Sequence, residues 1–167
     1  MDGENVQVDS FLLDRIEVTN MRWQACVEAG KCSARDGPAR HPVVGISLEE
    51  ATAFCAWAGG RLPTPGEYRA STAGGPWPWG EDTPSCAHAV GRGCDGPLPA
   101  GAAPLGASAD GAFDLAGNAW EWLADGTLVG GGADSGSESL GRRGLIVPDP
   151  DDGPPHPWAG VRCAYAL

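Results

Sequence analysis

The six cysteines constrain the fold of this chain more than any other feature of its sequence. Two local pairs are favoured: Cys26 and Cys32 flank Gly30, where a helix can end and the chain fold back, and Cys86 and Cys94 bracket a short Gly-containing loop. Disulfides would indicate an oxidising compartment, and the alternative is a cytosolic protein with buried free thiols. Zinc is disfavoured because no Cys-x-x-Cys motif or close Cys/His cluster is present.

The segment 111–125 is unusual because oxygen-bearing side chains alternate there with small residues. Asp114, Asn118 and Glu121 are interleaved with Gly117 and Ala119, which leave backbone carbonyls accessible. A calcium ion takes six to eight oxygen ligands from carboxylates and carbonyls, and one such turn could supply several of them. The alternative is that the polar residues cap turns while the neighbouring tryptophans pack a core.

Three helices have recognisable ends. Asn20 is expected to cap a helix over 21–29 that ends at Gly30. Ser47-Leu-Glu-Glu50 is a capping box, which predicts a helix to about Ala58 before Gly59-Gly60. Thr64-Pro-Gly-Glu67 repeats that box, with proline at the first helical position, and predicts a short third helix.

The strand signals are weaker. Residues 6–18 alternate loosely and predict one or two short strands, and further strands are expected at 128–132 and 158–165. Irregular structure is expected in the Gly- and Pro-rich stretch from residue 75 to about residue 110, and in the acidic loop at 148–155. No internal repeat or linker is visible, so a single domain over 1–167 is expected.

Charge and hydropathy exclude several kinds of partner. A formal net charge of -11 argues against nucleic acid and against anionic membrane surfaces. No apolar run approaches the length of a membrane helix, so no membrane insertion is expected. The acidic start, Met1-Asp-Gly-Glu-Asn5, does not read as a signal peptide, so an export signal is expected to have been either processed off or left out of this chain.

Several spaced motifs together carry a resemblance to a known family. They are Phe11–Asn20, His41–Ser47, Ala53–Thr64, Trp77-Pro-Trp-Gly80, Gly117-Asn-Ala-Trp-Glu-Trp122 and Gly160-Val-Arg-Cys-Ala164. Their order and content resemble the formylglycine-generating enzyme (sulfatase-modifying factor) family. The resemblance implies an α+β, C-type-lectin-like fold of short antiparallel strands with two or three helices. It also implies a third disulfide, Cys55–Cys163, between the second helix and the last strand.

The resemblance also implies that the family's oxidative chemistry is missing. In the resembling enzymes two cysteines, five residues apart after a Gly-Gly-Ser strand, bind copper and oxidise a substrate cysteine. Ser135 and Leu140 stand at those positions, and no cysteine lies between 94 and 163, so no copper is expected. A second branch uses iron held by a separate helical domain. His41, His88 and His156 are not at helical metal-ligand spacing, so no iron is expected and no catalytic residue is assigned.

Every ligand position of one calcium site of the resembling family has a matching residue in this chain. Its ligands fall on Asp114, Gly117, Ala119 and Glu121, and we expect one calcium ion with a structural role there. The family's second site is expected to be lost, because its first ligand position is Ala87-His88 here.

The remaining candidate is a surface in place of the family's active site. It comprises Asp134, Ser135, Ser137, Glu138, Arg142 and Arg143, and the alternative is that this segment is a flexible loop left after the chemistry was lost. The sequence therefore predicts a non-catalytic binding or assembly module of an exported bacterial protein, periplasmic, cell-surface or secreted. Its expected partner is a protein or glycan, within a larger envelope complex. The alternative is an oxidoreductase or accessory enzyme of the same superfamily with unidentified cofactor ligands.

Overall fold

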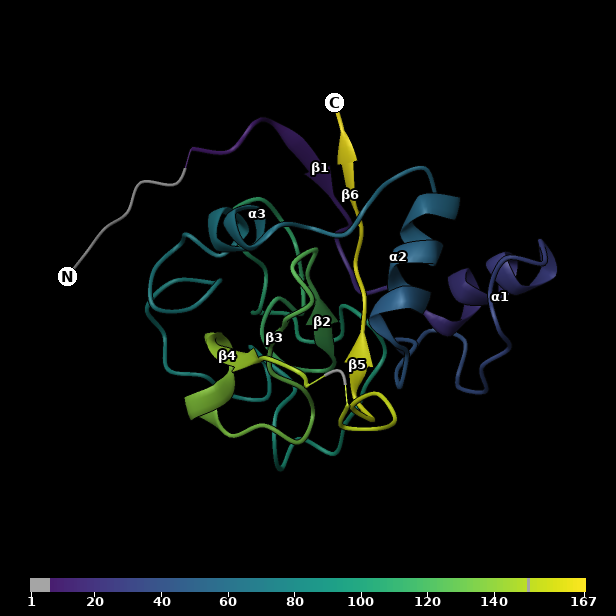
Figure 1. The fold of residues 1–167 in the computed structure, drawn as a ribbon. Helices are drawn as coiled ribbons and strands as arrows, with labels where there is room; N and C mark the ends of the chain where they lie inside the picture. The colour runs from purple at the N-terminus through teal and green to yellow at the C-terminus, as the bar shows by residue number, and fades with distance from the viewer. Residues whose placement is uncertain (1–6, 150) are drawn as a thin grey trace.

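The computed structural model describes residues 7–149 and 151–167. Within them the chain has three α-helices and two small sheets, so the expected α+β, C-type-lectin-like arrangement is confirmed (Figure 1). The helices are α1 (Asn20–Glu28), α2 (Leu48–Trp57) and α3 (Pro65–Ser71), with a single 3-10 turn, η1 (Ser137–Ser139). None of the described helices has the length and apolar character needed to cross a membrane.

The two ends of the described chain lie side by side. β1 (Phe11–Leu13) pairs antiparallel with β6 (Ala164–Ala166), with Leu12 opposite Tyr165 (Figure 1). The strand prediction over 6–18 holds only for these three residues, and Val6 lies outside the described residues. Beyond Leu13 the backbone contact with the closing segment is reduced to separate hydrogen bonds, from the Asp14 amide to the Cys163 carbonyl and from the Val18 amide to the Val161 carbonyl.

A four-stranded sheet forms the centre of the molecule. Its order is β4-β3-β2-β5, comprising β4 (Gly141–Ile146), β3 (Leu128–Gly130), β2 (Trp120–Trp122) and β5 (Ala159–Gly160). β2 pairs antiparallel with β3 and parallel with β5. The expected closing strand at 158–165 is therefore two strands in different sheets, β5 and β6, because the chain leaves one sheet and enters the other between them.

Side-chain caps fix the starts of the three helices. Both predicted capping boxes are present: Ser47 and Glu50 exchange hydrogen bonds at α2, and Thr64 and Glu67 do so at α3. The cap assigned to Asn20 is wrong. Thr19 caps α1 by accepting from the Arg22 amide, while the Asn20 side chain donates to the Pro38 carbonyl. The helix therefore begins one residue earlier than predicted.

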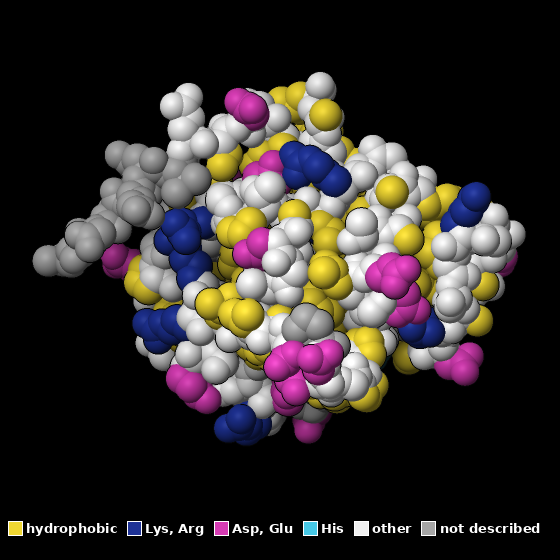
Figure 2. Space-filling view, viewed as in Figure 1, with side chains coloured by type: hydrophobic (Ala, Val, Ile, Leu, Met, Phe, Trp, Pro, Cys, Tyr) yellow, Lys and Arg dark blue, Asp and Glu magenta, His cyan; other side chains and the backbone are white. Residues whose placement is uncertain are grey.

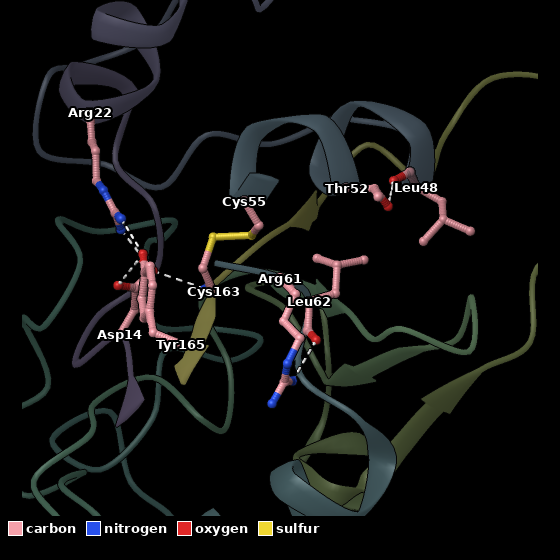
Figure 3. The surroundings of a disulfide bond; sticks show 9 residues. All are labelled: Asp14, Arg22, Leu48, Thr52, Cys55, Arg61, Leu62, Cys163 and Tyr165. Carbon is pink, nitrogen blue, oxygen red and sulfur yellow. Dashed lines mark hydrogen bonds and ion pairs between the residues drawn. A yellow bond between two sulfur atoms is a disulfide. The ribbon is translucent and has the colours of Figure 1, made fainter. Parts of the chain in front are cut away.

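All three predicted disulfides are present. Cys26–Cys32 closes the end of α1, and Cys86–Cys94 closes a loop in the irregular segment. Cys55–Cys163 joins α2 to the residue before β6, across 108 positions (Figure 3). Both of its cysteines are fully buried in the main apolar cluster, together with side chains of α1, α2 and the central strand.

A polar clasp lies beside that long-range disulfide. Asp14 accepts hydrogen bonds from the Cys163 amide, at 2.9 Å, and from the Tyr165 hydroxyl, at 3.1 Å. Arg22 reaches from α1 to the same carboxylate, at 2.7 Å (Figure 3). The clasp and the disulfide together tie α1, α2 and the paired terminal strands into one unit.

Candidate functional site

The turn before β2 adopts backbone conformations that only a few residue types tolerate. Asp114 and Asn118 have φ values of 58° and 67°, in the left-handed region. Asp and Asn are the residues other than glycine that enter this region most readily. The Asn118 side chain also accepts from the Leu98 amide, at 2.9 Å, and donates to the Leu98 carbonyl, at 3.1 Å. The turn thus anchors the long irregular segment to the sheet.

A buried carboxylate from the N-terminal segment supports this turn. Glu17 accepts from the Ala119 amide and from the Asn118 side chain, each at 2.8 Å. Burial raises the pKa of Glu17 well above its usual range, and the nearby carboxylates of Asp114 and Glu121 raise it further. Glu17, Asp114 and Glu121 are carboxylates that lie close together. Ionisation of all three is therefore unfavourable unless a positive charge is close.

Arg162 supplies that positive charge. Its guanidinium donates to both carboxylate oxygens of Glu121, at 2.8 and 2.7 Å, and this forked geometry is the strong form of the pair. It also donates to the carbonyls of Asp14 and Phe113, at 3.1 and 2.6 Å. Burial opposes the charge, but the carboxylates of Glu121, Glu17 and Asp114 together outweigh it and hold the pKa of Arg162 above its ordinary value.

Asp114 is the least satisfied member of the group. One of its oxygens accepts from the Gly101 amide, at 2.5 Å. The other is buried and has no hydrogen-bond partner among the described residues. Burial raises the pKa of Asp114 accordingly, with the Gly101 bond and Arg162 acting in the opposite direction. An orphaned buried carboxylate oxygen of this kind is what a bound cation would satisfy.

The four expected calcium ligands come from the turn and from β2, which contains Glu121, but they are not all free to bind. Both Glu121 oxygens are held by Arg162, so coordination would require Glu121 to change partner. Nowhere in the described chain do three His, Cys, Asp or Glu side chains form a group that could hold a metal ion. Among the described side chains, that of Asp114 has a buried oxygen without a hydrogen-bond partner. Calcium binding at this turn stays a prediction.

Asp114→Asn tests calcium binding more cleanly than any change at Glu121, which would also leave Arg162 buried without its partner. If calcium binds, a concentration a hundred times the dissociation constant stabilises the protein by about 2.7 kcal/mol. That corresponds to roughly 5–10 °C in melting temperature for a chain of this size. We expect calcium to raise the melting temperature of the wild type relative to EDTA, and Asp114→Asn to lose the increase. Equal melting temperatures in calcium and in EDTA for both proteins would rule the site out.

The candidate binding surface at 134–143 is exposed only in part. Asp134, Ser137 and Glu138 are exposed, whereas Ser135 is buried and accepts from the Gly132 amide, at 2.9 Å. The Ser135 carbonyl accepts from the Arg92 amide, at 2.8 Å. These bonds hold the turn in one conformation.

The two arginines of this surface contact the body of the domain. Arg142 donates to the Thr72 hydroxyl and the Arg69 carbonyl at the end of α3, at 2.8 and 2.6 Å. Arg143 lies over the Trp77 ring, 4.4 Å from its centroid. The six residues therefore form a fixed surface and are not an unattached loop.

The three histidines lie in separate places. His41 is at the end of the loop after α1, and His88 contacts Ser85 and the Trp79 ring. His156 accepts from the Trp158 amide through Nδ1, so its Nε2 carries the proton and faces Asp134 at 4.0 Å. None of them belongs to a three-residue metal group among the described residues.

Sequence reasoning missed Glu17 and Arg162 as members of this site. Each is charged yet lies in a segment with apolar neighbours, Glu17 beside Val18 and Arg162 between Val161 and Cys163. A charged residue at an otherwise buried position normally has a charged or hydrogen-bonding partner, and that signal was available in the sequence.

Comparison with known proteins identifies related sequences. The family model for the sulfatase-modifying factor enzyme 1-like domain matches residues 2–143. Hercynine oxygenase of Mycolicibacterium thermoresistibile is 32% identical over 160 residues, covering 70% of this chain and 36% of that enzyme. Formylglycine-generating enzyme of Thermomonospora curvata is 35% identical over 128 residues, covering 62% of this chain and 42% of the enzyme. The chain thus spans well under half the length of these relatives.

Solved structures share the fold. PvdO from Pseudomonas aeruginosa superimposes with a TM-score of 0.77 at 21% identity, covering 94% of this chain and 80% of PvdO. Treponema denticola variable protein 1 superimposes with a TM-score of 0.71 at 18% identity, covering 97% and 86%. At these identities the likeness concerns the fold alone.

Proposed function

The chain belongs to the sulfatase-modifying factor enzyme 1-like domain family, and from that premise we propose that it is a non-catalytic binding or assembly module. The observation that carries the proposal is the state of its sulfur atoms. All six cysteines lie in the described residues, and every one of them is in a disulfide. A copper-dependent oxidation of a substrate cysteine needs reactive thiolates, and none is available.

The positions of the expected thiol pair have structural roles instead. The Ser135 hydroxyl accepts a backbone hydrogen bond within its own turn. Leu140 is buried in a small apolar cluster with Trp77, Ala89 and Ala116. A buried leucine and a hydrogen-bonded serine stabilise this part of the fold but offer no ligand to a soft metal ion.

A rigid surface at the same place supports a binding role. Asp134, Ser137 and Glu138 are exposed on a segment that Arg92, Arg142 and Arg143 fix to the rest of the domain. A preorganised surface loses less conformational entropy when a partner binds. The three disulfides favour an oxidising, extracytoplasmic compartment, and a protein or glycan of the envelope is the partner we propose.

Metal analysis of the purified protein separates this proposal from its alternative. One of the relatives is an oxygenase by name, so an oxidoreductase with other cofactor ligands is the competing function. We expect less than about a tenth of an equivalent of copper or iron after aerobic purification and reconstitution, because no soft or His-rich ligand set is present. The T. curvata enzyme, treated in parallel, is the positive control. Stoichiometric copper or iron in this protein would overturn the proposal.

A further inference from the structure

A groove adjoins the candidate binding surface through His156, which lines the groove and faces Asp134 at 4.0 Å. It has a volume of about 830 Å³ and is bounded by the first turn of α2, the turn after β2 and the loop that joins β4 to β5. Neither Ser135 nor Leu140 lines it. Its volume is in the range of sites that bind small ligands or a few residues of a peptide.

One side of the groove is apolar. Trp122, Leu128 and Ile146 are direct cross-strand neighbours on β2, β3 and β4, and all three line the groove. Leu48, at the start of α2, and Val147, just after β4, extend the apolar lining. Val147 is 74% exposed, which is unusual for an aliphatic side chain next to a sheet. The groove therefore offers apolar area that a partner could cover.

The rim of the groove is acidic. Glu49, Asp125, Asp149 and Asp152 line it, and no lysine or arginine does. No salt bridge involves these four carboxylates among residues 7–149 and 151–167. Figure 2 shows acidic side chains gathered over the loop between β4 and β5, beside apolar side chains. The rim thus presents one sign of charge next to an apolar surface.

We propose that this groove, termed the acidic groove, binds a basic segment of another protein, in which lysine or arginine alternates with apolar residues. Basic side chains would pair with the rim while apolar side chains cover Val147 and Ile146. A second copy of this chain is a poor occupant, because each copy carries a net charge of -11 and like charges across an interface are unfavourable. The inference rests on the proposed binding role and adds the partner's chemistry and a second surface.

A synthetic peptide tests the proposal directly. The probe is a fluorescein-labelled octapeptide of alternating lysine and valine, with a glutamate–valine peptide of equal length as control. Neither contains cysteine, so binding is measured independently of any oxidase activity. We expect fluorescence polarisation to detect binding of the basic peptide only. The combined change Glu49→Gln, Asp125→Asn, Asp149→Asn and Asp152→Asn should weaken that binding about tenfold or more.

A matched variant separates the groove from the overall charge. Neutralising Glu28, Asp36, Glu81 and Asp110, which are exposed elsewhere, changes the net charge equally and should weaken binding less than about threefold. Val147→Ser should weaken binding without changing charge. Circular dichroism melting confirms that each variant is folded. The proposal would be overturned if the groove variant and the matched variant lost peptide affinity equally, or if Val147→Ser left the affinity unchanged. Binding of calcium in the groove without binding of the peptide would also overturn it.

Discussion

Replacing Arg162 with methionine is expected to lower the free energy of unfolding by about 3–5 kcal/mol, because it leaves Glu121 buried without its cation. Arg162 is 1% exposed and contacts both Glu121 oxygens and two backbone carbonyls. The loss would also leave Glu121 near the other buried carboxylates, Glu17 and Asp114. Urea unfolding of the purified variant measures the change.

Arg61 provides the matched control for that experiment. It forms a comparable two-bond contact with Glu67, at 2.8 and 2.6 Å, but its side chain is 49% exposed. Arg61→Gln is expected to lower the free energy of unfolding by only about 1 kcal/mol, because Arg61 is half exposed and the buried Glu67 keeps its hydrogen bond from the Thr64 amide. The double variant Arg162→Met with Glu121→Gln should recover part of the loss, since no unpaired charge remains buried. Equal effects of the two single changes would contradict the importance assigned to the buried pair.

Removing the Cys55–Cys163 disulfide by alanine substitution is expected to have the second large effect. It should lower the free energy of unfolding by about 4–5 kcal/mol. The bond closes a separation of 108 positions, and in the chain-entropy model the stabilisation grows with the length of the closed loop. Both cysteines are fully buried, so the smaller alanine side chains also leave space in the core. The measurement is again the free energy of unfolding in urea.

The Cys26–Cys32 bond is the control for loop length. Its separation is 6 positions, and the same model gives about 2 kcal/mol for such a loop. Removing the Cys55–Cys163 bond should therefore lower the free energy of unfolding by roughly 2 kcal/mol more than removing the Cys26–Cys32 bond. If removing the short-range bond were the more damaging change, loop closure would not explain how the disulfides stabilise this fold.

The features that could be predicted from the sequence are those with local or family-wide signals. The capping boxes at Ser47 and Thr64 are complete within four residues, and both form. The pairing of Cys26 with Cys32 is also local, whereas that of Cys55 with Cys163 came from the family resemblance.

The features that could not be predicted depend on contacts between distant segments. Glu17 meets Asn118 across 101 positions, and Glu121 meets Arg162 across 41. β2 is only three residues long and contains a glutamate, so its sequence does not read as a central strand. The acidic groove brings together α2, β2 to β4 and the loop after β4, and no single stretch of sequence indicates it.

The most direct test of the central claim is an assay for oxidation of a cysteine-containing peptide. The claim is that the chain keeps the fold of an oxidative enzyme family while lacking its reactive thiol pair. The purified protein is incubated aerobically with copper and a sulfatase-type cysteine peptide, and conversion is followed by mass spectrometry beside the T. curvata enzyme. Our account predicts no conversion above the protein-free control. Enzyme-dependent, repeated turnover of the peptide cysteine would contradict it.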